Sequence, residues 1–358
     1  MNWEDRIGRR VKLRDLHVFL AVVQSGSMAK AAERLAVSQP VVSKTIADLE
    51  HAIGVRLLDR LPQGVEATAY GRALSSCGTA VFDDLRQGVQ AIDFLSDPNK
   101  GELRVASPTP LMDDLIPQVL DRLSRRHPHI VCHAAEGDTP TLNRLLRERK
   151  IDLVVSRTWG SHFGEDLSAE FLFDEALFVV AGLTNRWSRR RRIAFADLVD
   201  EPWVLPELDN LVGALISDGF RRSGVTLPPA RVVSNSMAVR SRLVENGGFL
   251  TLLPGSMLHF GAGRLRLKVL PVALPLKSQP VEVITLKNRT ANPVARLFVE
   301  ELRALTRPMT RRLPGVGTRG RAVAPFGCTG ERVGRARCAQ IDREPPRTGA
   351  TKLRRRAT

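Results

Sequence analysis

Apolar residues recur every three or four positions through the first part of the chain, which is the spacing of one face of an α-helix. The pattern is clear over 13–23 and again over 41–54. From Thr68 to about Ser96 the same spacing continues over roughly 25 residues. Before residue 60 no run alternates apolar and polar residues as a strand does. Short helices followed by one long helix are therefore expected.

The long helix carries a narrow apolar seam, which is typical of a helix that pairs with another helix. The seam consists of Tyr70, Leu74, Cys77, Val81, Leu85, Val89, Ile92 and Leu95. Gly78 and Gly88 each weaken the helix by up to about 1 kcal/mol relative to alanine. The turn-forming residues of 97–101 then end it and form a short linker.

Beyond Gly101, short apolar strands alternate with amphipathic helices. Strands are predicted at 102–108, 130–137, 151–157, 176–182, 203–206, 230–235, 249–255, 265–271 and 281–288. Helices are predicted at 111–127, 139–150, 236–247 and 292–307. This alternation indicates a buried, largely parallel sheet. Two α/β halves are expected, with crossing strands near 177–182 and 279–286.

Charge is unevenly distributed along the 358 residues. Lys and Arg number 54 against 38 Asp and Glu, for a net charge of +16. Thirteen basic and three acidic residues lie between Arg311 and Thr358, so this tail holds more than half of the excess. It is rich in Arg, Gly, Pro and Thr and has no apolar periodicity, which predicts disorder.

Composition and motifs exclude several classes of protein. The longest apolar runs fall short of the roughly 18 residues that a membrane span needs. The start, MNWEDRIGRR, lacks the apolar segment of a secretory signal, so a cytoplasmic location is expected. Four cysteines cannot form a disulfide framework, and they lack the paired spacing of a zinc site. Because hydrolase, phosphate-loop, dinucleotide and metalloprotease motifs are absent, no enzyme activity, catalytic residue, metal or cofactor is predicted.

The segment 27–50 is the most informative part of the sequence. Its first helix presents small and apolar side chains that let a second helix cross closely: Ala31, Ala32 and Leu35. Ser38 is expected to cap the second helix with its hydroxyl, and Pro40 suits a first helical turn. Ser27 is expected to cap the first helix and to bring Lys30 near a phosphate. A helix-turn-helix is therefore predicted.

The second helix of this segment has two distinct faces at 100° per residue. The apolar face consists of Val42, Ile46 and Leu49, and the opposite face of Pro40, Ser43, Lys44 and Ala47. A small, polar and cationic face suits the major groove, because bulky apolar groups would block approach to base edges. A helical hairpin with a solvated polar face gives the same pattern. Context favours DNA, since Arg60 and Gln63 flank a turn that can form a wing and Thr68 can cap the long helix.

Taken together, these residues resemble the winged helix-turn-helix of LysR-type transcriptional regulators. The most specific of them are Ala31, Ala32, Leu35, Ser38, Gln39, Pro40, Ser43, Ile46, Leu49, Glu50, Gly54 and the run from Leu57 to Arg60. The resemblance extends over roughly 11–307. Leu58 stands where the family usually has Phe, and Ala67 where it usually has Leu before Thr. The Arg-rich tail matches nothing in the family.

The resemblance implies an α+β chain in four parts. These are a winged helix-turn-helix domain at 1–67, a linker and dimerisation helix at 68–100, an effector-binding domain at 101–310 and a disordered tail at 311–358. The effector domain is expected to have two α/β lobes, similar to periplasmic ligand-binding domains. The linker helices are expected to join copies as a homodimer or homotetramer. Each copy then binds one half-site, and half-sites lie about one turn of DNA or a multiple of it apart.

The implied function is that of a ligand-responsive transcription factor. Its partners would be double-stranded DNA, a small-molecule effector, further copies of itself and, as a further candidate, RNA polymerase. Two alternatives stay open: an architectural DNA-binding protein without effector response, and an α/β enzyme fused to a DNA-binding module. Operator footprinting with and without effectors separates the three.

The DNA contacts that the resemblance implies lie on the two helices and the wing. Base or groove contacts are expected from Gln39, Pro40, Ser43 and Lys44. Backbone contacts are expected from Ser27, Lys30, Arg34, Ser38 and Arg60.

Effector contacts are expected where strands end, because in two-lobed α/β domains the ligand lies there beside helix amino termini. The candidates are Ser107, Thr109, Ser156, Arg157, Pro206, Glu207 and Ser236. The hydroxyl residues among them can equally be helix caps. Arg157 favours an anion. Residues 244–258 and 281–290 resemble family members that respond to sugars or aromatic acids.

The contacts assigned to the second helix lead to a prediction. Gln39→Ala and Ser43→Trp should each reduce discrimination between operator and random DNA. Lys44→Ala should weaken specific binding and make it less salt-dependent, because one positive charge in the groove is lost. Gel-shift titrations at several salt concentrations measure both effects. Unchanged operator preference in all three variants would refute the assignment.

Overall fold

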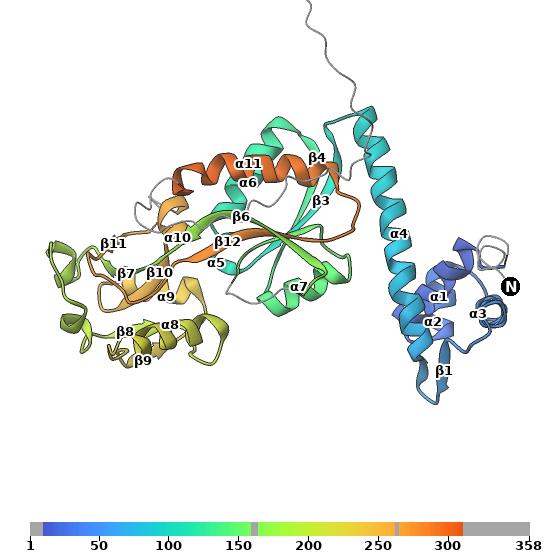
Figure 1. Ribbon diagram of the computed structural model, residues 1–358, viewed down its shortest axis with the longest axis horizontal. Helices are drawn as coiled ribbons and strands as arrows, with labels where there is room; N and C mark the ends of the chain where they lie inside the picture. The colour runs from blue at the N-terminus through green and yellow to red at the C-terminus, as the bar shows by residue number, and fades with distance from the viewer. Residues whose placement is uncertain (1–9, 159–163, 262–264, 311–358) are drawn as a thin grey trace, which may run out of the picture. The chain divides into compact units, whose positions relative to one another are not determined.

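The N-terminal domain contains the helices that the apolar spacing predicts. The computed structural model describes residues 10–158, 164–261 and 265–310. Three helices pack around one apolar core, at the blue end of the chain in Figure 1: α1 (Leu13–Ser25), α2 (Met28–Leu35) and α3 (Gln39–Ile53). Phe19, Val22 and Val42 in this core are fully buried. The predicted buried face of α3, which also includes Ile46 and Leu49, is confirmed.

A hairpin and a long helix follow α3. The hairpin consists of β1 (Leu58–Leu61) and β2 (Gly64–Ala67), and it is the wing predicted around Arg60 and Gln63. The long helix is α4 (Ala69–Ser96). Thr68 caps it as predicted, because its hydroxyl accepts a hydrogen bond from the Gly71 amide at 3.0 Å. Gly71 and Gly78 are both buried where α4 packs against the N-terminal domain.

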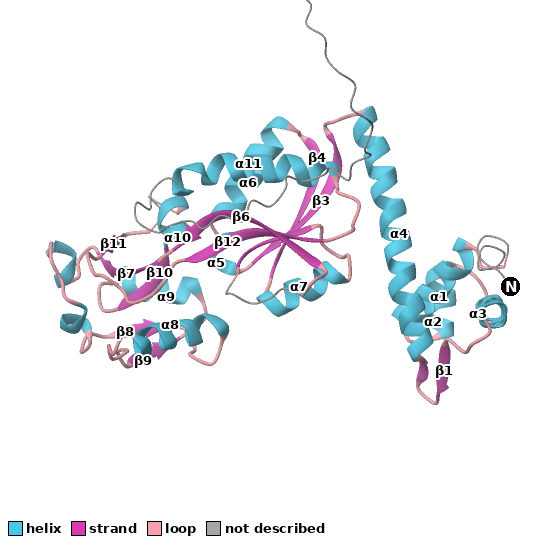
Figure 2. Ribbon diagram, viewed as in Figure 1, coloured by secondary structure: helices cyan, strands magenta, loops and turns pink. Residues whose placement is uncertain are grey.

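The first of the two α/β lobes that follow α4 is built on a five-stranded sheet. Its strands, in spatial order, are β4 (His129–Glu136), β3 (Lys100–Ser107), β5 (Leu153–Arg157), β12 (Gln279–Leu286) and β6 (Leu167–Glu175). α6 (Leu115–Arg126) and α11 (Pro293–Thr310) cover one face, and α7 (Thr139–Arg147) covers the other (Figure 2). The short α5 (Thr109–Met112) precedes α6.

The second lobe is built on another five-stranded sheet. Its order is β11 (Leu267–Val269), β7 (Leu177–Gly182), β10 (Leu250–Pro254), β8 (Trp203–Leu205) and β9 (Ala230–Val233). α8 (Leu211–Arg222) packs on one face together with the 3₁₀ turns Arg186–Arg189 and Phe195–Leu198. α9 (Met237–Glu245) and α10 (Gly255–Phe260) pack on the other.

The expectation of largely parallel sheets is wrong. In the first sheet β3 is parallel to β4 and β5, but β12 is antiparallel to both β5 and β6. In the second sheet β7 is antiparallel to β10 and β11, while β8 is parallel to β9 and β10. The chain passes between the sheets at Ala176 and again over 270–278. The strands that precede or follow such a passage are as apolar as parallel strands. The pattern of apolar residues therefore does not show in which direction they run.

Three other elements differ from the sequence prediction. The helix predicted over 111–127 is broken at Asp113 and Asp114 into α5 and α6. β6 and α8 were not predicted. α8 contains Gly213 and Gly219, which lower helix propensity. The tail beyond Arg311, for which disorder is predicted, lies outside the described residues.

The described residues lack both a membrane-spanning helix and a metal-binding cluster. None of their helices is long and apolar enough to cross a membrane. They also contain no group of three or more His, Cys, Asp or Glu side chains placed to hold a metal ion.

The packing of α4 gives a matched pair of glycine substitutions. A Cβ at Gly71 would lie 2.0 Å from the Leu57 carbonyl oxygen, which is backbone held by the Thr68 amide at 2.9 Å. Gly71→Ala should destabilise the protein by about 1–3 kcal/mol, because the backbone must shift. Chemical denaturation measures the change.

Gly78→Ala is the control. Its Cβ would lie 2.9–3.3 Å from Cγ and both terminal methyls of Leu16, a side chain that can shift more readily than backbone. The gain in helix propensity, up to about 1 kcal/mol, should offset much of the cost. Equal losses in the two variants would contradict this account of the contact.

Candidate functional site

The outward face of α3 is polar, cationic and open. Gln39, Pro40 and Lys44 are exposed, and Ser43 is half-buried between them and the core. Thr45 is tied back to the helix, since its hydroxyl donates to the Val41 carbonyl at 2.9 Å. The first two turns therefore present short donors and acceptors and one ammonium group, with the 42% exposed Val41 beside them.

The caps of the two helices differ from each other. Ser27 caps α2 as predicted, with its hydroxyl accepting from the Lys30 amide at 3.5 Å. Ser38 occupies the N-cap position of α3, but its hydroxyl makes no capping hydrogen bond, so that part of the prediction is wrong. Pro40 in the first turn removes one amide that would need a cap. The Ser38 hydroxyl is therefore not engaged in capping α3.

Basic side chains flank the outward face of α3. Lys30 and Arg34 are exposed on α2, and the Arg34 guanidinium donates to the Gln24 side-chain oxygen at 2.8 Å. Arg60 is exposed on β1 of the wing. These positions are suited to contacts with phosphates on either side of a groove.

Glu50 ties the wing to α3, a role that the sequence analysis did not assign. One of its carboxylate oxygens accepts from the amides of Leu57 and Leu58, at 2.6 Å and 3.1 Å. These amides begin β1, so the hairpin is fixed to the last turn of α3. An acidic residue directly after the buried Leu49 could have indicated this role. Its partner amides are seven and eight residues away in the sequence, so the pairing could not be predicted.

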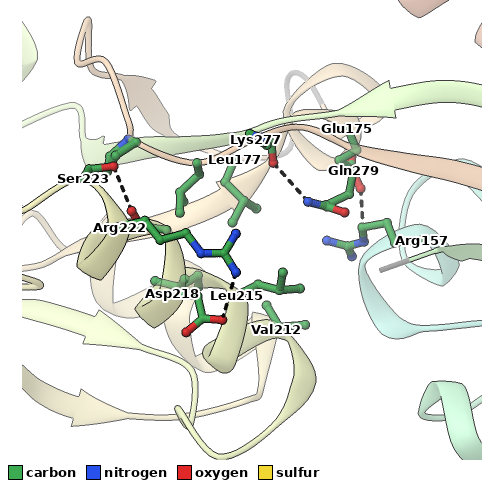
Figure 3. A pocket seen from close by; sticks show the side chains of 14 residues that line it. Arg157, Glu175, Leu177, Val212, Leu215, Asp218, Arg222, Ser223, Lys277 and Gln279 are labelled. Carbon is green, nitrogen blue, oxygen red and sulfur yellow. Dashed lines mark hydrogen bonds and ion pairs between the residues drawn. The ribbon is translucent and has the colours of Figure 1, made fainter. Parts of the chain in front are cut away.

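A pocket with a volume of about 210 Å³ opens where the two lobes meet (Figure 3). One side is formed by Arg157 and Glu175 at the ends of β5 and β6. Another is formed by α8, and a third by the second passage between the sheets, including Lys277, together with Gln279 at the start of β12. Its apolar wall includes Leu177, Val212, Leu215, Ile216, Pro275 and Leu276. The pocket thus combines an apolar wall with three cationic groups, the carboxylates of Glu175 and Asp218, and the amide of Gln279.

Of the seven predicted effector residues, Arg157 lines this pocket. The hydroxyls of Ser107, Thr109 and Ser156 are bonded within the first lobe, to the Val155 carbonyl at 2.7 Å, to the Glu136 carboxylate and to the Arg157 carbonyl at 3.3 Å. The Ser236 hydroxyl accepts from the Val239 amide and caps α9. Pro206 is buried, and Glu207 is exposed and bonded to Asn235.

Glu175 lines the pocket beside Arg157, but the sequence analysis does not single it out. Its side chain is almost fully buried, and one carboxylate oxygen lies 3.4 Å from the Arg157 Nε. The other oxygen accepts from the Ser256 amide at 2.8 Å. The residue ends β6, and this strand was not predicted. Glu175 therefore holds Arg157 of the first lobe and the start of α10 in the second lobe together.

Arg240 is a second buried guanidinium, and sequence reasoning also missed it. The residue is 7% exposed, and it donates to the Leu252 carbonyl at 3.4 Å and contacts the Met237 sulfur. Its Nε has no hydrogen-bond partner. Burial, together with the nearby charge of Arg157, lowers the pKa of Arg240 to about 10. Two buried cations therefore lie near the junction of the lobes, while Glu175 pairs with Arg157.

Comparisons with known proteins give a consistent result for both parts of the chain. Residues 13–72 match the family profile described as bacterial regulatory helix-turn-helix protein, lysR family, and residues 96–307 match the LysR substrate binding domain. The HTH-type transcriptional regulator GbpR of Azospirillum brasilense is 26% identical over 309 residues, which cover 85% of this chain and 89% of GbpR.

Two solved structures share the fold. A full-length OxyR variant from Pseudomonas aeruginosa has a TM-score of 0.60 at 22% identity, covering 85% of this chain and 99% of its own. Full-length CbnR, solved in complex with its target DNA, has a TM-score of 0.55 at 21% identity, covering 82% of this chain and 99% of its own.

The environment of Arg240 leads to a stability prediction. Because the folded state disfavours its charged form, the wild-type protein loses stability at neutral pH and regains it as pH rises through about 10. Arg240→Leu should remove this penalty and raise the thermal midpoint near pH 7 by about 2–4 °C. Differential scanning calorimetry measures the shift.

Arg242→Leu, on the same helix, is the control. Its side chain is 83% exposed and pairs with Glu245, so its loss should change the midpoint by less than about 1 °C. A lower midpoint for Arg240→Leu would mean that this guanidinium stabilises the folded protein.

Proposed function

The chain belongs to the LysR family of bacterial helix-turn-helix regulators, and on that basis we propose that it binds operator DNA through α3 and the wing under the control of an organic acid held between its lobes. The outward face of α3 carries this proposal: polar and cationic side chains stand exposed above a fully apolar inner face. A helix of this kind enters the major groove with its first turns against base edges.

We assign the DNA contacts to the two helices and the wing. Gln39, Pro40, Ser43 and Lys44 reach base edges or the groove wall, and Ser27, Lys30, Arg34, Ser38 and Arg60 reach the backbone. The Ser38 hydroxyl, which does not cap α3, supports a contact outside the chain. Glu50 supports joint docking, because it makes α3 and β1 move as one body. RNA polymerase is a further proposed partner, since an activator acts by contacting it.

The apolar seam of α4 supports a dimer. In the second half of the helix Leu85, Val89, Ile92 and Leu95 are 49%, 58%, 65% and 83% exposed. Large apolar side chains in a row along one helix are suited to a second helix of the same kind. We propose that two copies pair along this face, because a single helix-turn-helix contacts too few bases for useful specificity.

An organic acid fits the pocket better than a neutral sugar does. Arg157 and Lys277 supply positive charge, and the wall formed by Leu177, Leu215 and Ile216 suits an apolar skeleton. The buried guanidinium of Arg240 adds positive charge near the junction of the lobes. Arg157 already faces Glu175, and a carboxylate on the ligand can add charge-assisted hydrogen bonds to Arg157 and Lys277 that a neutral ligand cannot match. We therefore propose a carboxylate of moderate size as the effector.

The proposal is tested on the full-length chain with pairs of ligands that share a skeleton, such as benzoate and benzamide. Acids should raise the thermal midpoint, and their amides should not. A ligand at 100 times its dissociation constant stabilises by about 2.7 kcal/mol, so binding is readily seen. The acid that stabilises should also change the operator footprint.

Arg157→Gln should abolish the midpoint shift, because the pocket loses its buried cation. Arg221→Gln is the matched control, since Arg221 is exposed on α8 and does not line the pocket. Stabilisation by neutral sugars but by no acid would overturn the effector class. A chain that protects no DNA would overturn the regulatory function itself.

A further inference from the structure

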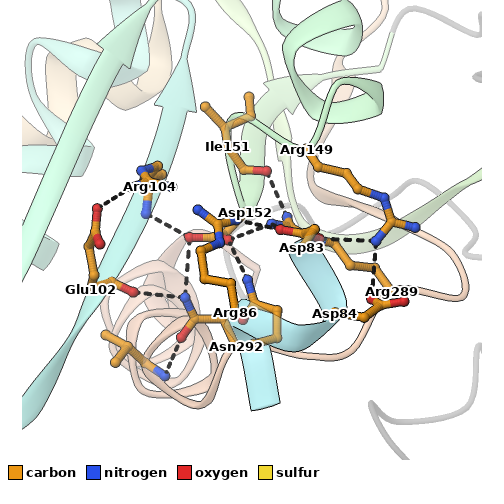
Figure 4. A network of polar contacts seen from close by, with 12 residues as sticks. Asp83, Asp84, Arg86, Glu102, Arg104, Arg149, Ile151, Asp152, Arg289 and Asn292 are labelled. Carbon is orange, nitrogen blue, oxygen red and sulfur yellow. Dashed lines mark hydrogen bonds and ion pairs between the residues drawn. The ribbon is translucent and has the colours of Figure 1, made fainter. Parts of the chain in front are cut away.

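A network of buried charges attaches the middle of α4 to the first lobe (Figure 4). Asp83 on α4 has a side chain that is only 4% exposed, and three guanidinium groups bind it. Arg289 donates to both of its oxygens at 2.7 Å and 2.9 Å, and Arg149 donates at 3.0 Å. Arg86, one turn along α4, is the third. These hydrogen bonds and the charge of Arg289 outweigh the effect of burial, so the pKa of Asp83 lies below its ordinary value.

A second buried carboxylate, Asp152, extends the network into the sheet. Arg289 lies 3.0 Å from it and also donates to the Ile151 carbonyl at 2.7 Å. Asp152 accepts from the Arg104 amide at 2.8 Å, from the Asn292 side chain at 3.2 Å and from Gln87 of α4 at 3.4 Å. Three segments far apart in the sequence therefore meet around α4: the residues before β5, those after β12, and the middle of β3.

The network determines which side of α4 faces the first lobe. At 100° per residue, Asp83, Gln87 and Phe94 share one side of the helix, and Phe94 packs against the core of this lobe. Leu85, Val89 and Ile92 lie on the opposite side and are exposed. A rotation of α4 about its own axis would break the network and would turn the apolar seam to a new direction.

Two neighbouring strands run from this network to the pocket. β5 starts next to Asp152 and ends at Arg157, and β12 starts at Gln279 and ends three residues before Arg289. The two strands pair with each other along their length, from Val281 opposite Arg157 to Ile284 opposite Val154. One end of this strand pair lies in the pocket, and the other holds the charges that bind α4.

We propose that the charge network of Asp83, Arg289 and Asp152 is a rotational lock on the linker helix, and that β5 and β12 couple it to the pocket. The regulatory role rests on the proposed effector pocket, whereas the lock itself is a property of the chain without ligand. Removing one charged partner leaves a buried charge uncompensated, so the lock is either fully made or broken. The orientation in which the seam of α4 meets a second copy, and with it the bend imposed on bound DNA, follows from the state of the lock.

Hydrogen exchange on the full-length protein tests the lock. Asp83→Asn keeps the shape of the side chain but removes its charge. Amides of α4 between residues 83 and 96 should exchange at least about tenfold faster, while those of α1, α2 and α3 should change by less than about twofold. Asp84→Asn is the control, because Asp84 is 47% exposed and its partner among the described residues, Arg149, also binds Asp83. Equal protection of α4 in the two variants would overturn the proposal.

Arg289→Lys is the second variant and decides the question if Asp83→Asn does not fold. It keeps the positive charge but loses the planar group that bonds Asp83, Asp152 and Ile151 at once. The same gain in exchange over 83–96 supports the lock, and its absence overturns it.

DNA bending separates a lock from a simple loss of stability. In a circular-permutation gel shift, Asp83→Asn should bind operator within about threefold of wild type but bend it by a different angle. A weaker complex with an unchanged bend would overturn the role in bending. A wild-type protein that binds no operator would contradict the proposed function and leave the exchange result standing.

Discussion

The return of the chain into the first sheet as β12 is the constraint on which the effector domain depends. β12 lies between β5 and β6 and is antiparallel to both, so this sheet is complete only after the second lobe has been traversed. The two passages between the sheets then lie beside each other at the base of the pocket. Glu175 precedes one passage and Lys277 belongs to the other. The floor of the pocket therefore exists only when both lobes are folded.

Buried charges in this protein are compensated to very different degrees. Asp83 and Asp152 share Arg289, and nearly every polar atom around them has a partner, which is the condition under which buried ions are tolerated. Arg240 has a carbonyl and a sulfur as neighbours and one nitrogen without a partner. The rule that buried charges have hydrogen-bond partners is commonly broken at functional sites, where binding offsets the cost in stability. This contrast supports the proposed effector site at the junction of the lobes and the proposed lock on α4.

The sequence was most informative where structure is determined by near neighbours. The three-residue and four-residue spacings of Val42, Ile46 and Leu49 were sufficient to orient α3, and the outward face followed from that orientation. The wing and the cap at Thr68 were likewise local. In contrast, the strands β6 and β12 gave no sign of their direction, because their partners are determined by passages over more than 100 residues of chain.

The pocket was less predictable for a related reason. Ser107 and Ser156 stand at strand ends as expected, but their hydroxyls are bonded to backbone carbonyls of the first lobe. Glu175 and Arg240 are charged residues in otherwise apolar surroundings, a signal that the sequence does contain. The sequence does not show that Glu175 and Arg240 lie near each other. They are brought together when β10 pairs with β7 beside the first passage. Only Arg157 was identified from both its position and its charge.

The bond between Glu50 and the amides of β1 has a consequence for how this protein can change its target. The groups that hold α3 and the hairpin together face inward or follow the chain. They are the apolar residues of α3, the carboxylate of Glu50 and the backbone amides that it accepts from. The exposed residues on the outward face of α3 are attached to this frame without supporting it. If they contact DNA as we propose, their substitution changes the target sequence and leaves the architecture intact.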